Sequence, residues 1–562
     1  MTKEPVWRRH YDPGVPPIID IPDLALPDLL YRSAAEYPNN PAVIFFGKTL
    51  SYQRLATLVR QAAAGLARLG LTAGQPLAII LPNCPQAIIA YYAALHLGAM
   101  VVMVNPLAAP REILDQLQRT GADLAVVLDQ LAPKVQQIRD KLPLRHLLVA
   151  SLADFLPFPL NCLYRFKSWR QHQQRGARRQ LSQTPFSELL QCRETDAPPM
   201  AARSRDIAIL QYTGGTTGVP KAAVLTHRNL VSNVLQINAW LQHCRPGQER
   251  ILSVLPYFHV FGMTAGMNWP LNLAGAIILL PRFDVTQVLK TIHRQRPTVF
   301  PSVPTIFIAL LHHPDLQRYD LTSLWGSISG SAPLPREVQA RFEALTKGRI
   351  IEGYGLTETS PVTHLNPIGS GGRSGSIGLP FPNTECRIVD TETGCREVPC
   401  GEVGELLLRG PQVMSGYWQN PGETDLAIRD GWFYTGDLAK MDEDGYFYIV
   451  DRKKDLIIAS GFNIFPREVE EVLHQHPAVQ EAVVFGVPES YRGETVMAVI
   501  VPVPGAAVDA QEIINFCRER LAAYKVPTII ECRPELPKTL VGKVLRRQLR
   551  QEAVAQRCAA PA

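Results

Sequence analysis

Residues 207–227 read IAILQYTGGTTGVPKAAVLTH and combine an apolar strand pattern with a loop rich in glycine and threonine. Glycines let a backbone turn tightly and expose its amide hydrogens, while threonine hydroxyls and a lysine add donors and a positive charge. The stretch therefore predicts a loop that binds a polyphosphate. The residues we expect to form it are Thr213, Gly214, Gly215, Thr216, Thr217, Gly218 and Lys221.

This loop differs from the phosphate loop of Walker-type nucleotidases. In those enzymes the lysine follows Gly-x-x-x-x-Gly and precedes a Ser or Thr whose hydroxyl holds magnesium. Here the spacing from Gly214 to Lys221 is different, and Ala222 occupies the position of the hydroxyl residue. The sequence disfavours that class.

Outward from the loop, short apolar runs alternate with helical patterns. Runs at 77–81, 124–128 and 276–280 are typical of strands joined by crossover helices, which predicts an α/β fold with largely parallel sheets. After Gly401 the pattern becomes hairpin-like, with strands expected at 404–409 and 445–450. From about Arg452 it resembles a small α+β domain. We therefore expect a large N-terminal region of layered α/β subdomains plus a small β subdomain, followed by a small C-terminal α+β domain.

Composition narrows the class of protein. The chain has 562 residues, which is too long for one hydrophobic core, and its net charge of +6 is too diffuse to indicate a nucleic-acid partner. Ten scattered cysteines show no zinc-site or disulfide spacing, so a reducing cytoplasm is expected. No secretory signal is recognisable near the N-terminus. The apolar stretch 87–104 contains His96 and Gly98, which favours a buried helix, a turn and a buried strand over a membrane span.

Residues 155–179 form a candidate membrane-surface segment. An aromatic and apolar run at 155–166 precedes the basic residues Lys167, Arg170, Arg175, Arg178 and Arg179, and no acidic residue occurs from 155 to 187. Apolar side chains beside a basic cluster can lie at an anionic headgroup layer, on the inner face of the cytoplasmic membrane. A solvated basic loop over the protein's own core is the alternative, and the sequence does not decide between them.

Four further motifs follow the phosphate loop in a fixed order. They are Gly353-Tyr-Gly-Leu-Thr-Glu358, Tyr434-Thr-Gly-Asp437, Asp451-Arg-Lys-Lys-Asp455 and Leu536-Pro-Lys-Thr-Leu-Val-Gly-Lys543. Together with the loop, they resemble the signature motifs of the adenylate-forming enzymes, over roughly Leu30 to Arg550. Within that family the chain is most similar to bacterial long-chain fatty-acid:CoA ligases. The resemblance implies domains at 1–450 and 454–562, joined by a hinge at 451–453 about which the small domain moves.

The resemblance also assigns a nucleotide site. It implies an adenine pocket made by Gly330, Ser331, Ala332, Tyr354 and Gly355. Tyr354 offers an aromatic face for the base, and the small residues allow the base to approach the backbone closely.

Magnesium and ribose contacts follow from the same motifs. Glu358 supplies a hard carboxylate oxygen for Mg²⁺ bound with ATP, and Thr213 a hydroxyl on the same ion, with Thr357 beside them in the catalytic motif. Asp437 can accept hydrogen bonds from both ribose hydroxyls, and Arg452 resembles the family's second ribose contact.

Lys543 matches the family's catalytic lysine. Attack of a carboxylate on the α-phosphorus brings two anions together, and a cation that contacts both offsets their repulsion. Without the family context, Lys543 would read as part of a solvated basic face.

The resemblance also assigns a second set of residues to the transfer of the acyl group onto coenzyme A (CoA), the co-substrate. Lys453 matches the hinge, and Ser460, Gly461 and Phe462 match the strand that closes the family's pantetheine tunnel. Phe258 and His259 lie in a motif that resembles the acyl site. No charged residue occurs there, so we expect an apolar tunnel, although His259 also fits a buried structural histidine.

Three functions remain open on the sequence. The favoured one is a long-chain fatty-acid:CoA ligase that uses ATP, fatty acid and CoA. The second is a fatty-acyl-AMP ligase that loads an acyl carrier protein. The third is a membrane-bound fatty-acid binding module whose enzyme core has decayed, which intact Lys543, Glu358 and Asp437 oppose. The oligomeric state is open, with a homodimer among the candidates.

Overall fold

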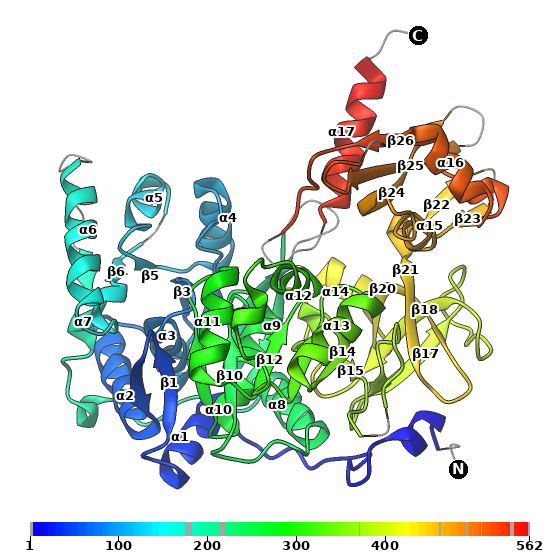
Figure 1. Ribbon diagram of the computed structural model, residues 1–562. Helices are drawn as coiled ribbons and strands as arrows, with labels where there is room; N and C mark the ends of the chain where they lie inside the picture. Colours follow the sequence, from blue (N-terminus) through cyan, green and yellow to red (C-terminus); the bar gives the residue numbers. More distant parts are fainter. Residues whose placement is uncertain are drawn as a thin grey trace.

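The computed structural model describes residues 4–142, 144–174, 183–213, 220–369, 371–459, 462–489, 493–506, 508–539 and 544–559. Within these residues the strands form four sheets. Figure 1 shows most of the chain gathered around the larger sheets, with the last sheet and helices α15–α17 standing to one side. This arrangement confirms the expected α/β class with a small C-terminal α+β unit.

The largest sheet has the strand order β16-β15-β14-β13-β12-β10-β11-β1-β2. Its inner strands pair in parallel and its edges end in antiparallel strands. Because β13 and β14 are parallel, their carboxyl ends lie at the same edge of the sheet. The predicted adenine residues 330–332 follow β13, and the motif Gly353–Glu358 begins at the end of β14. The strands are β1 (Pro41–Phe45), β2 (Lys48–Ser51), β10 (Arg250–Ser253), β11 (Ala276–Leu279), β12 (Val299–Ser302), β13 (Gly326–Ser329), β14 (Arg349–Gly355), β15 (Val362–Leu365) and β16 (Leu379–Pro380).

A second sheet has the order β7-β6-β5-β3-β4-β8-β9 and is parallel except for the β8–β9 hairpin. This hairpin encloses the predicted phosphate loop. The predicted strands at 77–81 and 124–128 and the apolar strand pattern before the phosphate loop lie in this sheet, whereas the strand predicted at 276–280 is β11 of the first sheet. Its strands are β3 (Pro76–Ile80), β4 (Met100–Met103), β5 (Leu124–Leu128), β6 (His146–Ala150), β7 (Gln183–Pro185), β8 (Ile207–Thr213) and β9 (Lys221–Thr226).

Helices fill the space between these sheets and cover their outer faces. Every residue of α3 is buried, and one continuous core joins it to strands of both sheets. The stretch 87–104 is thus a buried helix, a turn at Gly98 and a buried strand, as predicted. The helices before the third sheet are α1 (Leu26–Glu36), α2 (Tyr52–Arg68), α3 (Pro85–His96), α4 (Pro110–Thr120), α5 (Ala132–Gln136), α6 (Leu160–Gln174), α7 (Phe186–Leu189), α8 (His227–Trp240), α9 (Val260–Met263), α10 (Trp269–Asn272), α11 (Val285–Gln295), α12 (Pro304–Leu311) and α13 (Arg336–Thr346).

A third, largely antiparallel sheet carries the ribose motif. Its order is β17-β18-β20-β19, in which β19 pairs with the first two residues of β20. Strand β21 pairs with the second half of β20, from Asp437 to Met441. Its elements are β17 (Glu385–Val389), β18 (Gly404–Arg409), α14 (Pro421–Ala427), β19 (Ile428–Arg429), β20 (Trp432–Met441) and β21 (Phe447–Arg452). The strand expected at 445–450 begins two residues later, because Gly445 adopts a φ of 86° in the turn before it.

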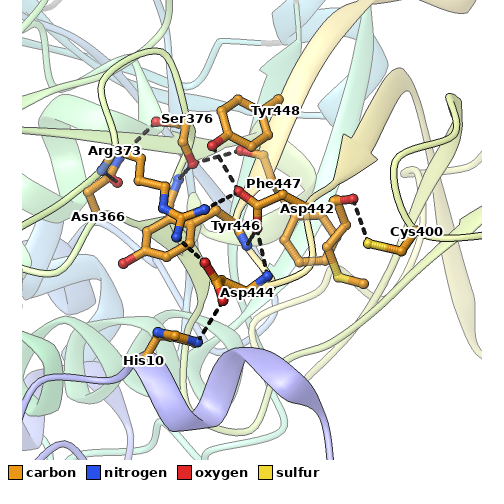
Figure 2. Close-up of polar contacts among 12 residues, drawn as sticks. His10, Asn366, Arg373, Ser376, Cys400, Asp442, Asp444, Tyr446, Phe447 and Tyr448 are labelled. Carbon is orange, nitrogen blue, oxygen red and sulfur yellow. Dashed lines mark hydrogen bonds and ion pairs between the residues drawn. The ribbon is translucent and has the colours of Figure 1, made fainter.

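The turn of the β20–β21 hairpin is fixed by charge and by the N-terminal segment (Figure 2). The Arg373 guanidinium pairs with Asp442 and Asp444 and lies 4.3 Å from the Tyr446 ring centroid. His10 reaches Asp444 from the N-terminal side, with Nε2 3.5 Å from Oδ1. These contacts hold the hairpin that presents Asp437 and Arg452 to the large sheet.

The fourth sheet follows the predicted hinge. It has the order β23-β22-β25-β24, with β26 parallel to β25, and has its own apolar clusters on both faces. Its elements are β22 (Ile457–Ala459), β23 (Phe462–Ile464), α15 (Pro466–Leu473), β24 (Val479–Glu489), β25 (Gly493–Pro502), α16 (Ala510–Arg518), β26 (Ile529–Cys532) and α17 (Arg546–Ala559). Lys453 lies in the short turn η8 (Lys453–Asp455) between β21 and this sheet. The proposed domain boundaries at 450 and 454 stay a prediction.

Among the described residues, no helix is both long enough and apolar enough to span a membrane.

Candidate active site

The end of β14 and the β20–β21 hairpin bring three predicted nucleotide contacts together. Asp437 and Arg452 are paired across the hairpin, and Arg452 Nε lies 3.2 Å from Asp437 Oδ1. The Tyr354 hydroxyl donates a 2.6 Å hydrogen bond to Asp437 Oδ2. Burial and the adjacent Asp437 charge raise the pKa of Tyr354 well above its ordinary value, so this hydroxyl keeps its proton. The result is a preorganised, buried carboxylate at a sheet edge, suited to accepting hydrogen bonds from a sugar.

Glu358 lies on the short helix η7 (Thr357–Thr359), which contacts β8 and β9. Its Oε1 accepts a 2.9 Å hydrogen bond from the Tyr417 hydroxyl, and burial raises the pKa of the Glu358 carboxyl. No cluster of three or more His, Cys, Asp or Glu side chains able to hold a metal occurs within the described ranges. Magnesium in nucleotide sites is typically held by one or two protein oxygens and by phosphates, so a lone Glu358 carboxylate fits that ion.

The phosphate loop itself lies outside the described residues, and with it Gly214, Gly215, Thr216, Thr217 and Gly218. Its two ends are paired in the β8–β9 ladder, Thr213 opposite Lys221. Thr213, the second predicted metal ligand, is therefore placed at the base of the loop. A cavity of about 120 Å³ beside this base is lined in part by Tyr212, Lys221 and Tyr417.

The predicted adenine segment follows β13 and is closely packed. A Cβ on Gly330 would lie 3.2 Å from the Phe261 ring, and Ser331 adopts a φ of 70° before Ala332. At Gly355 a Cβ would lie 2.1 Å from the Pro361 carbonyl oxygen, which no side chain tolerates without a backbone shift. Packing alone thus requires a glycine at position 355, whereas a side chain at position 330 would need only a small shift of the Phe261 ring.

The predicted acyl motif precedes α9. The side-chain amide of Gln211, on β8, donates a 2.8 Å hydrogen bond to the Phe258 carbonyl oxygen, which ties His259 and its neighbours to the phosphate-loop strand. A buried π-helix, η5 (Thr264–Asn268), continues the segment, and such irregular turns frequently occur at functional sites. No Asp, Glu, Lys or Arg occurs from 251 to 281, so the segment is suited to apolar ligands.

In the C-terminal unit, only part of the predicted machinery can be placed. Ser460, Gly461 and Lys543 lie outside the described residues. Phe462 is exposed and stacks on Tyr524, with ring centroids 4.5 Å apart and planes 20° apart.

The predicted hinge residue is anchored to the large region. Lys453 Nζ lies 2.8 Å from Oε2 of the buried Glu405, whose other oxygen accepts a hydrogen bond from the Gly436 amide. The hinge is thereby linked to the backbone of the ribose motif.

Comparison with known proteins places this geometry in a family. Residues 30–418 match the AMP-binding enzyme family, and residues 468–543 match the AMP-binding enzyme C-terminal domain. The chain belongs to the AMP-binding enzymes.

Relatives match this AMP-binding enzyme over nearly its whole length. A long-chain-fatty-acid–CoA ligase of Bacillus subtilis is 46% identical, and the match covers 98% of this chain and 99% of that protein. A protein of the same name from Escherichia coli O6:H1 is 39% identical, with 98% of both chains covered. Among solved structures, ATP-bound MatB from Rhodopseudomonas palustris gives a TM-score of 0.84 at 29% identity, covering 94% of this chain and 99% of that chain.

These matches confirm the family predicted from the five motifs. The residue assignments remain predictions, since the matches do not test individual side chains. The structure nevertheless gathers Tyr354, Asp437 and Arg452 in one cluster of this AMP-binding enzyme and places Glu358 beside the phosphate-loop strands.

Sequence reasoning missed two residues at the phosphate loop of the AMP-binding enzyme. Tyr417 contacts Glu358, and Glu423, on α14, pairs with Lys221. The segment Ser415-Gly-Tyr-Trp-Gln-Asn-Pro421 carries turn residues, but nothing in it indicates a partner some 200 positions away. Only the folded chain shows these contacts.

Proposed function

We propose that this AMP-binding enzyme is a long-chain fatty-acid:CoA ligase that converts ATP, fatty acid and CoA into acyl-CoA, AMP and pyrophosphate. The observation that carries this proposal is the full-length similarity to bacterial ligases of that name. The charge-free acyl motif next to β8 supports an apolar substrate.

In the first half-reaction, a fatty-acid carboxylate oxygen bonds to the α-phosphorus of ATP while the bond from that phosphorus to the pyrophosphate oxygen breaks. Asp437 and Arg452 would hold the ribose, which fixes the α-phosphate relative to the carboxylate. Lys543 would contact both anions and offset their repulsion. Mg²⁺, held by Glu358 and Thr213, would neutralise charge on the phosphates.

In the second half-reaction, the CoA thiolate attacks the acyl carbonyl carbon and AMP departs with the electron pair of the acyl–phosphate bond. Lys543 has no task in this step. Rotation of the C-terminal unit about Lys453 would remove it and bring the segment Ser460–Phe462 to the thiol. The Phe462 and Tyr524 rings would lie at the surface that CoA approaches.

Products distinguish the proposed ligase from the alternative. With oleate, ATP, Mg²⁺ and CoA, mass spectrometry should find oleoyl-CoA and AMP in equal amounts. Formation of ADP would reject an adenylate route. Oleoyl-AMP without oleoyl-CoA, followed by acylation of an added holo acyl carrier protein, would favour the carrier-loading ligase.

We further propose that α6 binds an anionic membrane surface at the cytoplasmic face. Leu160, Leu163 and Phe166 on this helix are exposed, whereas Tyr164 donates a hydrogen bond to Asp129. Phe158, just before the helix, is 81% exposed.

Charge supports a lipid partner for this helix. Arg165 and Lys167 lie on it, and the acid-free run continues through Arg170, Arg175, Arg178 and Arg179, the last three of which lie outside the described residues. Exposed apolar side chains with flanking cations suit an anionic bilayer, which both attracts the charges and takes up the apolar side chains.

A further inference from the structure

Lys221 ends the phosphate loop, and its charge is already paired within the protein. Its Nζ contacts Oε2 of Glu423 and lies 5.3 Å from the centroid of the Tyr417 ring. The Lys221 side chain is only 16% exposed and that of Glu423 34% exposed. The ammonium group therefore lies in a partly buried niche between a carboxylate and an aromatic face, where water screens the pair less than at the surface.

The segment that carries Tyr417 and Glu423 is fixed against the phosphate-loop strand. The amide of Trp418 donates to the Ala222 carbonyl oxygen at 2.8 Å, and that of Val224 donates to the Gly416 carbonyl oxygen at 2.9 Å. The Tyr417 amide donates to Thr424 Oγ1 at 2.9 Å, which joins the segment to the first turn of α14. Glu423 is thus held in place by backbone contacts and does not depend on its own side chain for its position.

A polyphosphate at this loop would compete with Glu423 for the same ammonium group. ATP brings several negative charges, and a carboxylate paired with Lys221 occupies the cation that would otherwise contact them. When two partners cannot share a group, the pair that exists before binding lowers the observed affinity of the incoming partner.

We propose that Glu423 is an internal counter-ion that holds Lys221 in the nucleotide-free enzyme and is displaced by the phosphates of ATP. This inference rests on the proposed role of Lys221 in ATP binding. The proposal also gives Glu423 a second effect. When Glu423 pairs with Lys221 again after adenylation, Lys221 binds pyrophosphate less tightly, and release of pyrophosphate is promoted.

The test compares the binding of ATP and of pyrophosphate, by calorimetry in the presence of Mg²⁺, to the wild-type chain and to Glu423→Gln. Glutamine keeps the shape of the side chain, and the helix cap is retained because it uses the Glu423 amide bonded to Asn420 Oδ1. We expect both dissociation constants to fall by about three- to tenfold, the range of an ion pair at this depth. Asp425→Asn, an exposed residue on the same helix, is the matched control and should change neither constant.

A double-mutant cycle separates displacement from a general charge effect. In a Lys221→Met background, Glu423→Gln should no longer tighten ATP binding. A gain that persists without Lys221, or unchanged or weaker binding in the single variant, overturns the counter-ion role while leaving the ATP site intact. Failure of the wild-type chain to bind ATP would reject the proposed function, and the counter-ion role with it.

Discussion

Tyr354 and Asp437, which lie on different sheets, are joined by a 2.6 Å hydrogen bond from the tyrosine hydroxyl to Oδ2 of the carboxylate. Arg452 contacts the other oxygen, so both acceptor atoms of this buried Asp437 are oriented before any ligand arrives. Preorganisation of this kind lowers the cost of binding, because the polar groups need not be ordered by the ligand.

Replacing Asp437 with Asn should therefore weaken ATP binding strongly. The amide keeps one acceptor but loses the negative charge that Arg452 and the ribose hydroxyls contact, and the half-buried Arg452 loses this ion-pair partner. We expect the KM for ATP to rise by about 10- to 100-fold, the effect of losing one charge-assisted pair. Steady-state pyrophosphate release measures it, with Tyr354→Phe as the milder comparison. An unchanged KM in Asp437→Asn would contradict the ribose assignment.

Lys543→Ala should separate the two half-reactions. Adenylate formation from ATP and fatty acid should fall by at least about 100-fold, because the cation that bridges two anions is removed. Thioester formation from supplied acyl-AMP and CoA should be retained. Lys538→Ala is the control, since Lys538 pairs with Glu481 within the C-terminal unit. Equal loss of both half-reactions would refute the role given to Lys543.

The exposed apolar side chains of α6 lead to a membrane-binding prediction. Leu163 and Phe166 are 62% and 57% exposed, and changing both to Ser should reduce partition onto vesicles containing phosphatidylglycerol by about tenfold or more. Vesicle sedimentation measures this. Leu107→Ser, which removes an apolar side chain of similar exposure elsewhere, is the matched control and should have no effect. If the double variant binds vesicles as the wild type does, α6 is an ordinary surface helix.

Glu352 predicts a pH dependence of stability. Burial raises the pKa of this carboxyl from 4.5 to about 7, although the Leu334 amide donates to Oε1. Below pH 4.5 both the folded and unfolded carboxyls are neutral. Between pH 4.5 and 7 the unfolded chain releases the proton first, so the contribution to stability is lost as the pH rises through this window.

Glu352→Gln should abolish that loss. The free energy of unfolding of the wild type should fall relative to the variant by up to about 3 kcal/mol between pH 4.5 and 8. Urea denaturation at several pH values measures this difference. Glu337→Gln, on an exposed part of α13, serves as the control. Parallel pH profiles for the wild type and Glu352→Gln would show that Glu352 does not titrate in this range.

Local patterns predicted the elements of the fold, and ordered motifs predicted the family. The helix, turn and strand of 87–104 follow from an apolar run broken at Gly98, and Tyr354, Asp437 and Arg452 are found together as their motifs implied. The early start predicted for β21 was wrong because Gly445 adopts a φ of 86° in the turn before the strand. Tyr417 and Glu423 were missed because their partners lie on elements distant in the sequence.

The most direct test of the proposed function is pyrophosphate release by the purified protein with ATP and Mg²⁺, across fatty acids from acetate to oleate, with and without CoA. We predict release that increases with chain length and that needs CoA for repeated turnover. A single stoichiometric burst that is indifferent to CoA would identify a carrier-protein acceptor instead. No release with any of these acids would contradict the proposed substrate class.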